Sequence, residues 1–210
     1  MFETLENLLQ LIILSVCAAV SLLSALKRRK RPHMLLFFFY LSYLLGDLYW
    51  QVCLFYFDET PRISVVSDLS WYAAYLFLYL LIMTEGGNKH KNGRLAACAA
   101  KAFPVLMALF YMQWGEVLSN IIYALIMGLL FSRITGVLFS KTGKTEGRRL
   151  RRLCLTAMIF CLAEYASWTS SCFWDVDALR YTYYAGDLLM TLCFPFFIAA
   201  LKAAPGEADA

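Results

Sequence analysis

Seven apolar runs, each about 20 residues long, dominate this chain of 210 residues. They cover residues 5–26, 34–57, 63–83, 95–113, 117–139, 152–174 and 179–201. A helix needs about 20 mostly apolar residues to cross a bilayer. Charged side chains make up only 16% of the sequence, too few to cover this much apolar surface in water. We therefore predict an all-α integral membrane protein whose seven transmembrane helices form one domain over residues 1–202, followed by a short cytoplasmic tail, 203–210.

Basic residues are distributed very unevenly between the connections. Fifteen fall on one side of the predicted membrane: residues 27–31, Lys89, Lys91, Arg94, Lys141, Lys144, Arg148, Arg149, Arg151, Arg152 and Lys202. The other side has Arg62 and Arg180 with several acids, among them Asp58, Glu59 and Asp177. Cytoplasmic loops carry the excess of Lys and Arg. We therefore expect an outside N-terminus and an inside C-terminus in a prokaryotic cytoplasmic membrane, and a retained first helix instead of a cleaved signal peptide.

The basic inner segments allow two interpretations. The favoured one is that they set the topology and touch anionic lipid headgroups. The other is that they dock a cytoplasmic partner, and association into a homo-oligomer also stays open. The net charge of +4 follows from this asymmetry, so it does not require a nucleic-acid partner.

Four carboxylates interrupt the apolar runs, at Asp47, Asp68, Glu164 and Asp187. An acid at the centre of a membrane helix costs about 2.5–3.5 kcal/mol on insertion scales, so it normally faces the protein interior or a water-filled cavity. Each of the four has a Trp or Tyr about one helical turn away. The sequence therefore predicts an outward-facing chamber lined by acids and aromatic rings.

Helical periodicity selects the residues that share a face with these acids. The predicted ligand-binding residues are Asp47, Trp50, Asp68, Trp71, Tyr72, Tyr75, Asn120, Tyr123, Glu164, Trp168, Tyr184 and Asp187. Carboxylates beside aromatic faces suit an organic cation, because each ring adds a cation–π attraction of about 0.5–2 kcal/mol. Proton coupling through Asp47 or Glu164 is one further consequence. The competing interpretation is that the acids form hydrogen bonds between helices and only stabilise packing.

The tryptophans also have two interpretations. Trp114 and Trp174 sit at the ends of runs, as expected of an interfacial aromatic belt. Trp50, Trp71 and Trp168 lie about two turns further in, on faces that carry an acid. We assign these three to the chamber.

Two prolines and two cations inside the apolar runs complete the pattern. Pro104 and Pro195 lie inside apolar runs, where proline kinks a helix. Lys101 and Arg133 lie in the inner halves of their runs, and we expect both to extend toward the inner headgroups.

Residues 5–83 and 117–201 show a weak internal similarity, joined by the run 95–113. At offsets of 118 or 119 residues the matching pairs are Trp50 and Trp168, Cys53 and Cys172, Asp68 and Asp187, and Phe77 and Phe196. This predicts a parallel 3+1+3 repeat. In topology it resembles the SWEET-type sugar transporters and the nicotinamide riboside carriers, which implies a binding site between the repeats. The proline-glutamine dipeptide of that group is absent, because Val105 and Phe196 follow the two span prolines.

Several chemistries lack their residues. Microbial rhodopsins share the seven-span topology but need a lysine in the middle of the last helix, where Asp187 and Thr191 stand here. The histidines, His33 and His90, both lie in inner connections, so no haem or zinc site is expected inside the membrane. No hydrolase or phosphate-binding motif is present, and we expect no cofactor. Most of the seven cysteines are expected to pack as small apolar residues, with a Cys53–Cys172 disulfide as the alternative.

The sequence leaves three functions open. The first is a small transporter for a polar metabolite, either cationic or uncharged. The second is a seven-helix sensor that binds an extracellular small molecule and signals through a separate cytoplasmic protein. The third is a structural or accessory membrane subunit, in which the acids would be dispensable.

Overall fold

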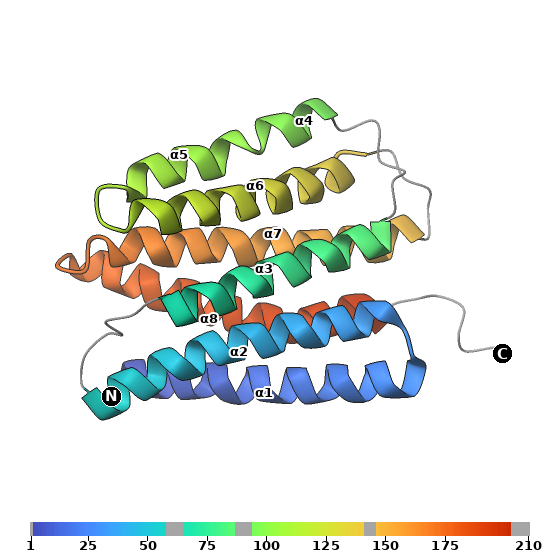
Figure 1. Ribbon diagram of the computed structural model, residues 1–210, viewed down its shortest axis with the longest axis horizontal. Coiled ribbons are helices and arrows are strands. Elements are labelled where there is room, and N and C mark those ends of the chain that lie inside the picture. The colour runs from blue at the N-terminus through green and yellow to red at the C-terminus, as the bar shows by residue number, and fades with distance from the viewer. Residues whose placement is uncertain (1, 58–64, 87–93, 141–145, 203–210) are drawn as a thin grey trace. The chain divides into compact units, whose positions relative to one another are not determined.

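The computed structural model describes residues 2–57, 65–86, 94–140 and 146–202. Every regular element in these ranges is an α-helix (Figure 1). Six of the helices are long and apolar enough to cross a membrane: Leu5–Arg28, Arg31–Phe57, Val65–Gly86, Val117–Leu138, Gly147–Ser171 and Asp177–Lys202. The prediction of an all-α integral membrane protein is confirmed at this level. The chain divides into two compact units, residues 1–81 and 82–210.

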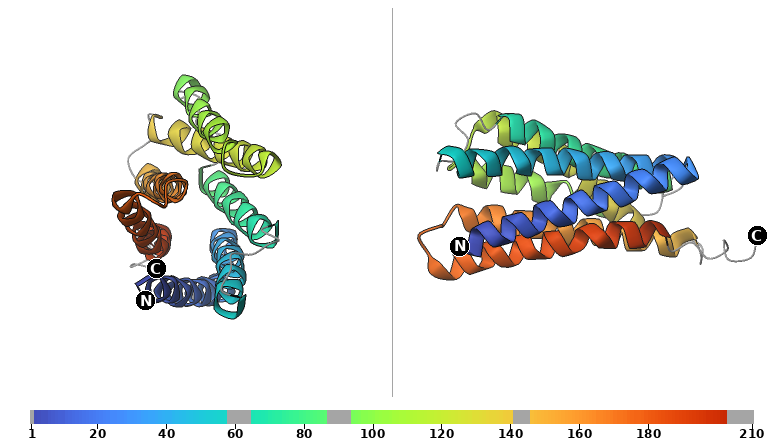
Figure 2. Two further views of the ribbon diagram at one scale, coloured as in Figure 1. Left: turned by 90° about the vertical axis from the view of Figure 1, so that its left-hand side faces the viewer. Right: turned by 90° about the horizontal axis from the view of Figure 1, so that it is seen from below.

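The first unit contains α1 (Phe2–Arg28), α2 (Arg31–Phe57) and most of α3 (Val65–Gly86). Helices α1 and α2 lie side by side, joined by only two residues (Figures 1 and 2). Arg29 in this connection has a φ of 48°, a left-handed conformation that costs an L-residue roughly 1–2 kcal/mol. Pro32 falls in the first turn of α2, where proline needs no hydrogen-bond partner.

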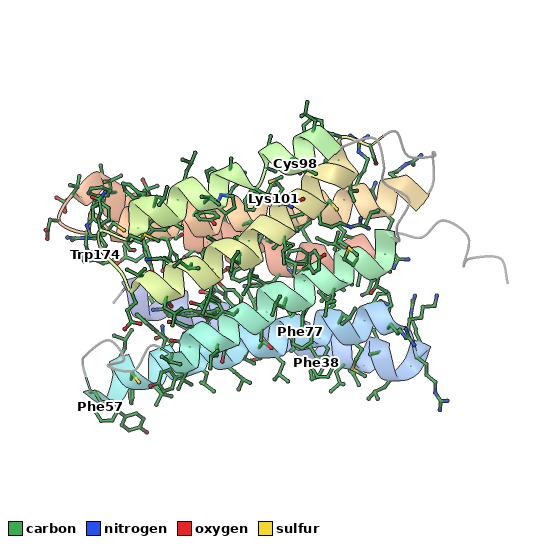
Figure 3. All side chains as sticks on the ribbon, turned by 45° about the horizontal axis from the view of Figure 1, so that its top comes forward. Phe38, Phe57, Phe77, Cys98, Lys101 and Trp174 are labelled. Atoms are coloured by element: carbon green, nitrogen blue, oxygen red, sulfur yellow. The ribbon has the colours of Figure 1, made fainter. Side chains whose placement is uncertain are left out.

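Aromatic side chains join α2 to α3. The rings of Phe38 and Phe77 stack with centroids 5.2 Å apart, and Figure 3 shows the two labelled side chains next to each other. Tyr40 and Tyr75 are both fully buried. Aromatic side chains bury about 150–250 Å² each, so they supply much of the packing surface of this unit.

The second unit contains the end of α3 and five further helices. These are α4 (Arg94–Ala99), α5 (Ala102–Tyr111), α6 (Val117–Leu138), α7 (Glu146–Ser171) and α8 (Asp177–Lys202). Helices α4 and α5 pack on α6, α6 packs on α7, and α7 packs along α8, as the views of Figures 1 and 2 agree. Arg149 and Glu85 form an ion pair of 3.0 Å between the first turn of α7 and the last turn of α3.

The predicted helix over residues 95–113 is broken into two. Helix α4 ends at Ala99, a turn follows at Ala100 and Lys101, and α5 begins at Ala102 (Figure 3). Pro104 explains the position of the break. It has no N–H to bond to the carbonyl of Ala100, and its ring would clash with that carbonyl in a continuous helix. Helix α5 then accommodates Pro104 in its first turn.

One other expectation about the helices needs correction. Helix α7 begins at Glu146, not near residue 152, because Arg and Leu are good helix formers and extend the helix through the basic segment. Pro195 lies inside α8 without ending it. The side chain of Pro195 is exposed, and a kink of α8 at this residue stays a prediction.

Some predictions fall outside the described residues. These concern the outer charges Asp58, Glu59 and Arg62, the inner residues Lys89, His90, Lys91, Lys141 and Lys144, and the tail 203–210.

Candidate functional site

Asp47 is held by a tryptophan of the neighbouring helix. The indole Nε1 of Trp71 on α3 donates a hydrogen bond to Asp47 Oδ1 on α2 at 3.0 Å. Trp50, one turn beyond Asp47, contacts the same indole with ring centroids 5.9 Å apart. Three of the predicted site residues therefore meet in the first unit as an acid and two indoles.

Gly46 makes this arrangement sterically feasible. A Cβ added at Gly46 would lie 2.6 Å from Trp71 Nε1 and 2.8 Å from its Cδ1. Real Cβ contacts are essentially never that short, so the indole would have to move. Gly46 thus gives the Trp71 ring its place on α2, next to the carboxylate of Asp47.

The remaining predicted residues of the first unit lie along α3. Tyr75 is fully buried, and its ring meets the edge of Tyr43 with centroids 6.5 Å apart. Asp68 and Tyr72 are half-buried, one turn from each other. The predicted face of α3 is therefore turned mainly toward protein, as the periodicity indicated.

Glu164 lies on α7 in the second unit, and only 5% of it is exposed. It is within electrostatic reach of the hydroxyls of Tyr111 and Tyr165. Lone carboxylates are rarely buried unless a partner compensates the loss of water. Its surroundings are consequently polar and aromatic together.

An aromatic cluster surrounds this part of α7, formed by Tyr111 of α5, Tyr123 of α6 and Tyr165 and Trp168 of α7. Tyr123 and Trp168 stack nearly parallel with centroids 5.5 Å apart. Tyr165 packs against Tyr123 at 5.7 Å, and Tyr111 against Trp168 at 5.9 Å. The Tyr111 hydroxyl lies 2.8 Å from Thr169 Oγ1 and donates to the Tyr165 carbonyl oxygen at 3.2 Å. Helices α5 and α6 thus both place a tyrosine against Trp168 and Tyr165 of α7.

Asn120 is buried below the turn that joins α5 to α6. A Cβ added at Gly115 in this turn would lie 3.3 Å from its Nδ2. Neither Asn120 Nδ2 nor Tyr165 Oη makes a hydrogen bond to another described group, although both atoms are buried. Buried polar groups are normally satisfied by protein or by water. The second unit therefore has unused hydrogen-bonding capacity near its aromatic cluster.

Asp187 is buried at the contact of α7 and α8, with 7% exposed. Its carboxylate has Ser167 and Tyr183 as hydrogen-bond partners. The neighbouring Gly186 lies directly against Ser167, and a Cβ there would also lie 3.1 Å from the carbonyl oxygen of Ala163. Small residues let the two backbones approach closely, which brings Ser167 within reach of Asp187.

Tyr184 belongs to a separate aromatic group at the turn between α7 and α8. Its ring centroid lies 6.1 Å from that of Trp174, and Tyr183 lies 5.3 Å from the same indole. The guanidinium of Arg180 sits over Trp174 at 5.4 Å from the ring centroid. This aromatic group at the α7–α8 turn already holds one cation of the chain itself on an aromatic face.

The structure therefore brings the predicted residues together in subsets. Asp47, Trp50 and Trp71 meet in the first unit, and Tyr123 and Trp168 meet in the second. Tyr184 belongs to the aromatic group at the α7–α8 turn, and Asp187 is placed at the α7–α8 contact. A single chamber that contains all four acids stays a prediction.

Periodicity missed several residues that contact the predicted ones: Tyr111, Tyr165, Ser167, Thr169 and Tyr183. Tyr165 follows Glu164 directly, so it lies about 100° around the helix, on a face that was not selected. Tyr111 lies near the end of the run 95–113, which contains no acid that would select a face. Its contacts with Tyr165 and Thr169 of α7 depend on helix packing, which the sequence pattern does not give.

The cysteines and possible metal ligands add no further site. All seven cysteines are free thiols, and Cys17, Cys154, Cys161 and Cys193 are buried as apolar packing residues. Within the described ranges, no three His, Cys, Asp or Glu side chains are grouped so that they could hold a metal ion.

No family model matches this chain, and no curated protein or solved structure matches it either. The function must therefore be argued from the site itself.

Proposed function

We propose that this chain is a small membrane transporter for an organic cation, with an outside N-terminus and an inside C-terminus. Six of its spans are the long apolar helices. The seventh is the broken segment Leu95–Tyr111, whose 17 residues would rise about 25 Å if fully helical. This is shorter than a typical hydrocarbon core of about 30 Å, and local thinning of the bilayer accommodates such a mismatch.

The proposed architecture is the 3+1+3 repeat, with α4 and α5 as the linker between residues 5–83 and 117–201. Its support is the spaced matches of the sequence, among them Trp50 with Trp168 and Asp68 with Asp187. Repeats related by an axis along the membrane normal place substrate sites near their interface.

The main observation in favour of a cationic ligand is that Glu164 is buried beside the aromatic cluster of Tyr111, Tyr123, Tyr165 and Trp168. A carboxylate supplies the counter-charge for a cation, and the faces of Tyr and Trp add about 0.5–2 kcal/mol per ring. Arg180 over Trp174 supports this ligand class, since it puts a guanidinium on an aromatic face of the same unit. Asn120 and Tyr165 provide hydrogen-bonding groups for polar substituents of the ligand.

A second function is favoured by a different observation. Asp47 accepts a hydrogen bond from Trp71, and Asp187 has Ser167 as a partner, so both acids link neighbouring helices. In an accessory subunit these bonds would serve packing alone. Interhelical hydrogen bonds in membranes contribute about 0.6 kcal/mol each on average. Two acids that stabilise helix packing in this way need no ligand to account for their presence.

Uptake into proteoliposomes separates these functions. The purified chain is reconstituted and tested with radiolabelled choline and guanidinium, with uncharged glucose as the comparison. We expect cation uptake, reduced at least about tenfold in Glu164→Gln, because about 1.4 kcal/mol of lost attraction already gives a factor of 10. Glu116→Gln is the matched control, since Glu116 is an exposed acid at the start of α6.

Each other outcome identifies a different function. Cation binding without translocation would reject transport and favour the sensor, which would need a cytoplasmic partner or a second copy at its basic inner segments. The accessory subunit would be favoured by two results together. The chain would show neither uptake nor binding, and its Glu164 and Asp47 variants would lose thermal stability. Asp177→Asn, at an acid whose side chain is 86% exposed, is the matched control for Asp47→Asn.

A further inference from the structure

The first turns of α7 carry four arginines with two different environments. Arg149 is half-buried and pairs with Glu85 at 3.0 Å. Arg148, Arg151 and Arg152 are exposed, and the described part of the chain gives their guanidinium groups no hydrogen bond or ion pair. The extension of α7 beyond its apolar part therefore presents three arginines outward.

These three arginines share one helical face with apolar residues. The exposed positions that follow them on α7 are Leu155, Ile159 and Leu162, at 53%, 38% and 46% exposure. At about 100° per residue, all six positions fall within an arc of about 100°. The face is continuous, with guanidinium groups at its end and apolar side chains over the next turns.

We propose that this face of α7 binds an anionic phospholipid, with its phosphate on Arg148, Arg151 and Arg152 and its acyl chains along the apolar residues. The choice of a lipid follows from the continuity of the face, because a free anion would not use the apolar part. Neighbouring arginines, about 1.5–6 Å apart along the helix axis, can engage one headgroup together.

Arginine is better suited than lysine to bind a phosphate group. The guanidinium is a planar fork that binds phosphate oxygens through paired hydrogen bonds, whereas lysine acts as a point charge. Topology alone needs only the charge. A test that exchanges Arg for Lys therefore separates a phosphate site from a charge that only orients the helix.

Native mass spectrometry of the full chain in detergent measures this binding. The chain is mixed with phosphatidylglycerol and with phosphatidylcholine of the same acyl chains. An anionic surface adds about 1 kcal/mol per nearby basic residue, or about a fivefold preference each. We expect wild type to favour phosphatidylglycerol by at least about tenfold, and R148Q/R151Q/R152Q to abolish this preference.

Two further variants decide the mechanism. R148K/R151K/R152K keeps the charge, and with it the orientation of the helix, and should lose several-fold in phosphatidylglycerol binding. K27Q/R29Q/R31Q removes three exposed charges where α1 ends and α2 begins. It leaves the α7 face intact, so it should lose less than about twofold.

Three results would overturn the proposal. The Lys variant could bind phosphatidylglycerol as well as wild type. The α1–α2 variant could lose as much as the α7 Gln variant, which would show a general charge effect. Inorganic phosphate at millimolar concentration could displace phosphatidylglycerol completely, which would show an anion site that does not use the acyl chains.

Discussion

Close helix contacts in this chain depend on single glycines. Trp71 packs on the bare backbone of Gly46, and Ser167 packs on that of Gly186. In both places the residue that follows the glycine is a buried or half-buried acid, Asp47 or Asp187. The glycine lets a hydrogen-bond partner from the neighbouring helix approach, and that partner then contacts the acid. Gly128 of α6 differs, because nothing lies within 4 Å of a Cβ added there.

Gly46→Ala should therefore destabilise the protein. The new methyl would meet the indole of Trp71 and push it away from Asp47, breaking the 3.0 Å hydrogen bond. Overpacking of this kind costs about 1–3 kcal/mol. Thermal unfolding in detergent, followed by tryptophan fluorescence, should show a lower midpoint and an altered emission spectrum.

Gly128→Ala is the matched control for this substitution. It adds the same methyl group to a helix of similar length, in a space without neighbours, and removes the helix-destabilising glycine. Its midpoint should be equal to or higher than that of wild type. Equal midpoints for both variants would show that Trp71 does not depend on Gly46 for its place.

Sequence periodicity predicted which residues of each helix share a face, but not which side chains meet. It placed Asp47 and Trp50 on one face of α2, and both contact Trp71, which was selected on α3 by the same reasoning. Ser167 was missed because its contact with Asp187 depends on how closely α7 approaches α8. That approach depends on Gly186, and a helical repeat within one helix contains no such information.

At the scale of the elements, α4 and α5 show how one residue divides a helix. The six long helices were expected from their apolar length alone, and their ends differ by a few residues where basic side chains extend a helix. The broken segment was expected only to kink. The sequence does not show whether a helix bends or stops at a proline. The packing of neighbouring elements decides this.

Pro104→Ala should join α4 and α5 into one helix. Alanine restores the N–H that can bond to the Ala100 carbonyl, and it removes the clash of the proline ring. The distance between spin labels at Leu95 and Leu109, which are both exposed, shows whether the two helices have joined. A straight helix places these positions about 21 Å apart along its axis, and the variant should approach this value with a narrower distribution.

Pro195→Ala provides the comparison, with a label pair of the same spacing on α8. Helix α8 is continuous through Pro195, so its label distance should change little. A Pro104→Ala chain that kept the wild-type distance would show that contacts with α6, such as that of Ala97 with Gly136, hold the break without the proline.

At the scale of the whole molecule, the number of spans decides on which side each terminus lies. In the part of the chain that the structure describes, six helices are long enough to cross. The segment Leu95–Tyr111 is the seventh span only if it crosses despite its length and its break. Lys101 lies exposed at that break, and a long basic side chain near the membrane surface can extend to the headgroups. An odd number of spans puts the termini on opposite sides, and an even number puts them on the same side.

We therefore predict that reporters at the two termini lie on opposite sides of a bacterial membrane. Green fluorescent protein fused after Lys202 should fluoresce in the cytoplasm, and alkaline phosphatase fused there should be inactive, because basic residues accumulate on the cytoplasmic side. A tag at the N-terminus should be accessible to a protease added to intact spheroplasts.

Alkaline phosphatase fused after Gly86 and after Trp114, which flank the broken segment, should be inactive and active respectively. If both of these fusions report the same side, α4 and α5 do not cross, and the 3+1+3 repeat fails with them.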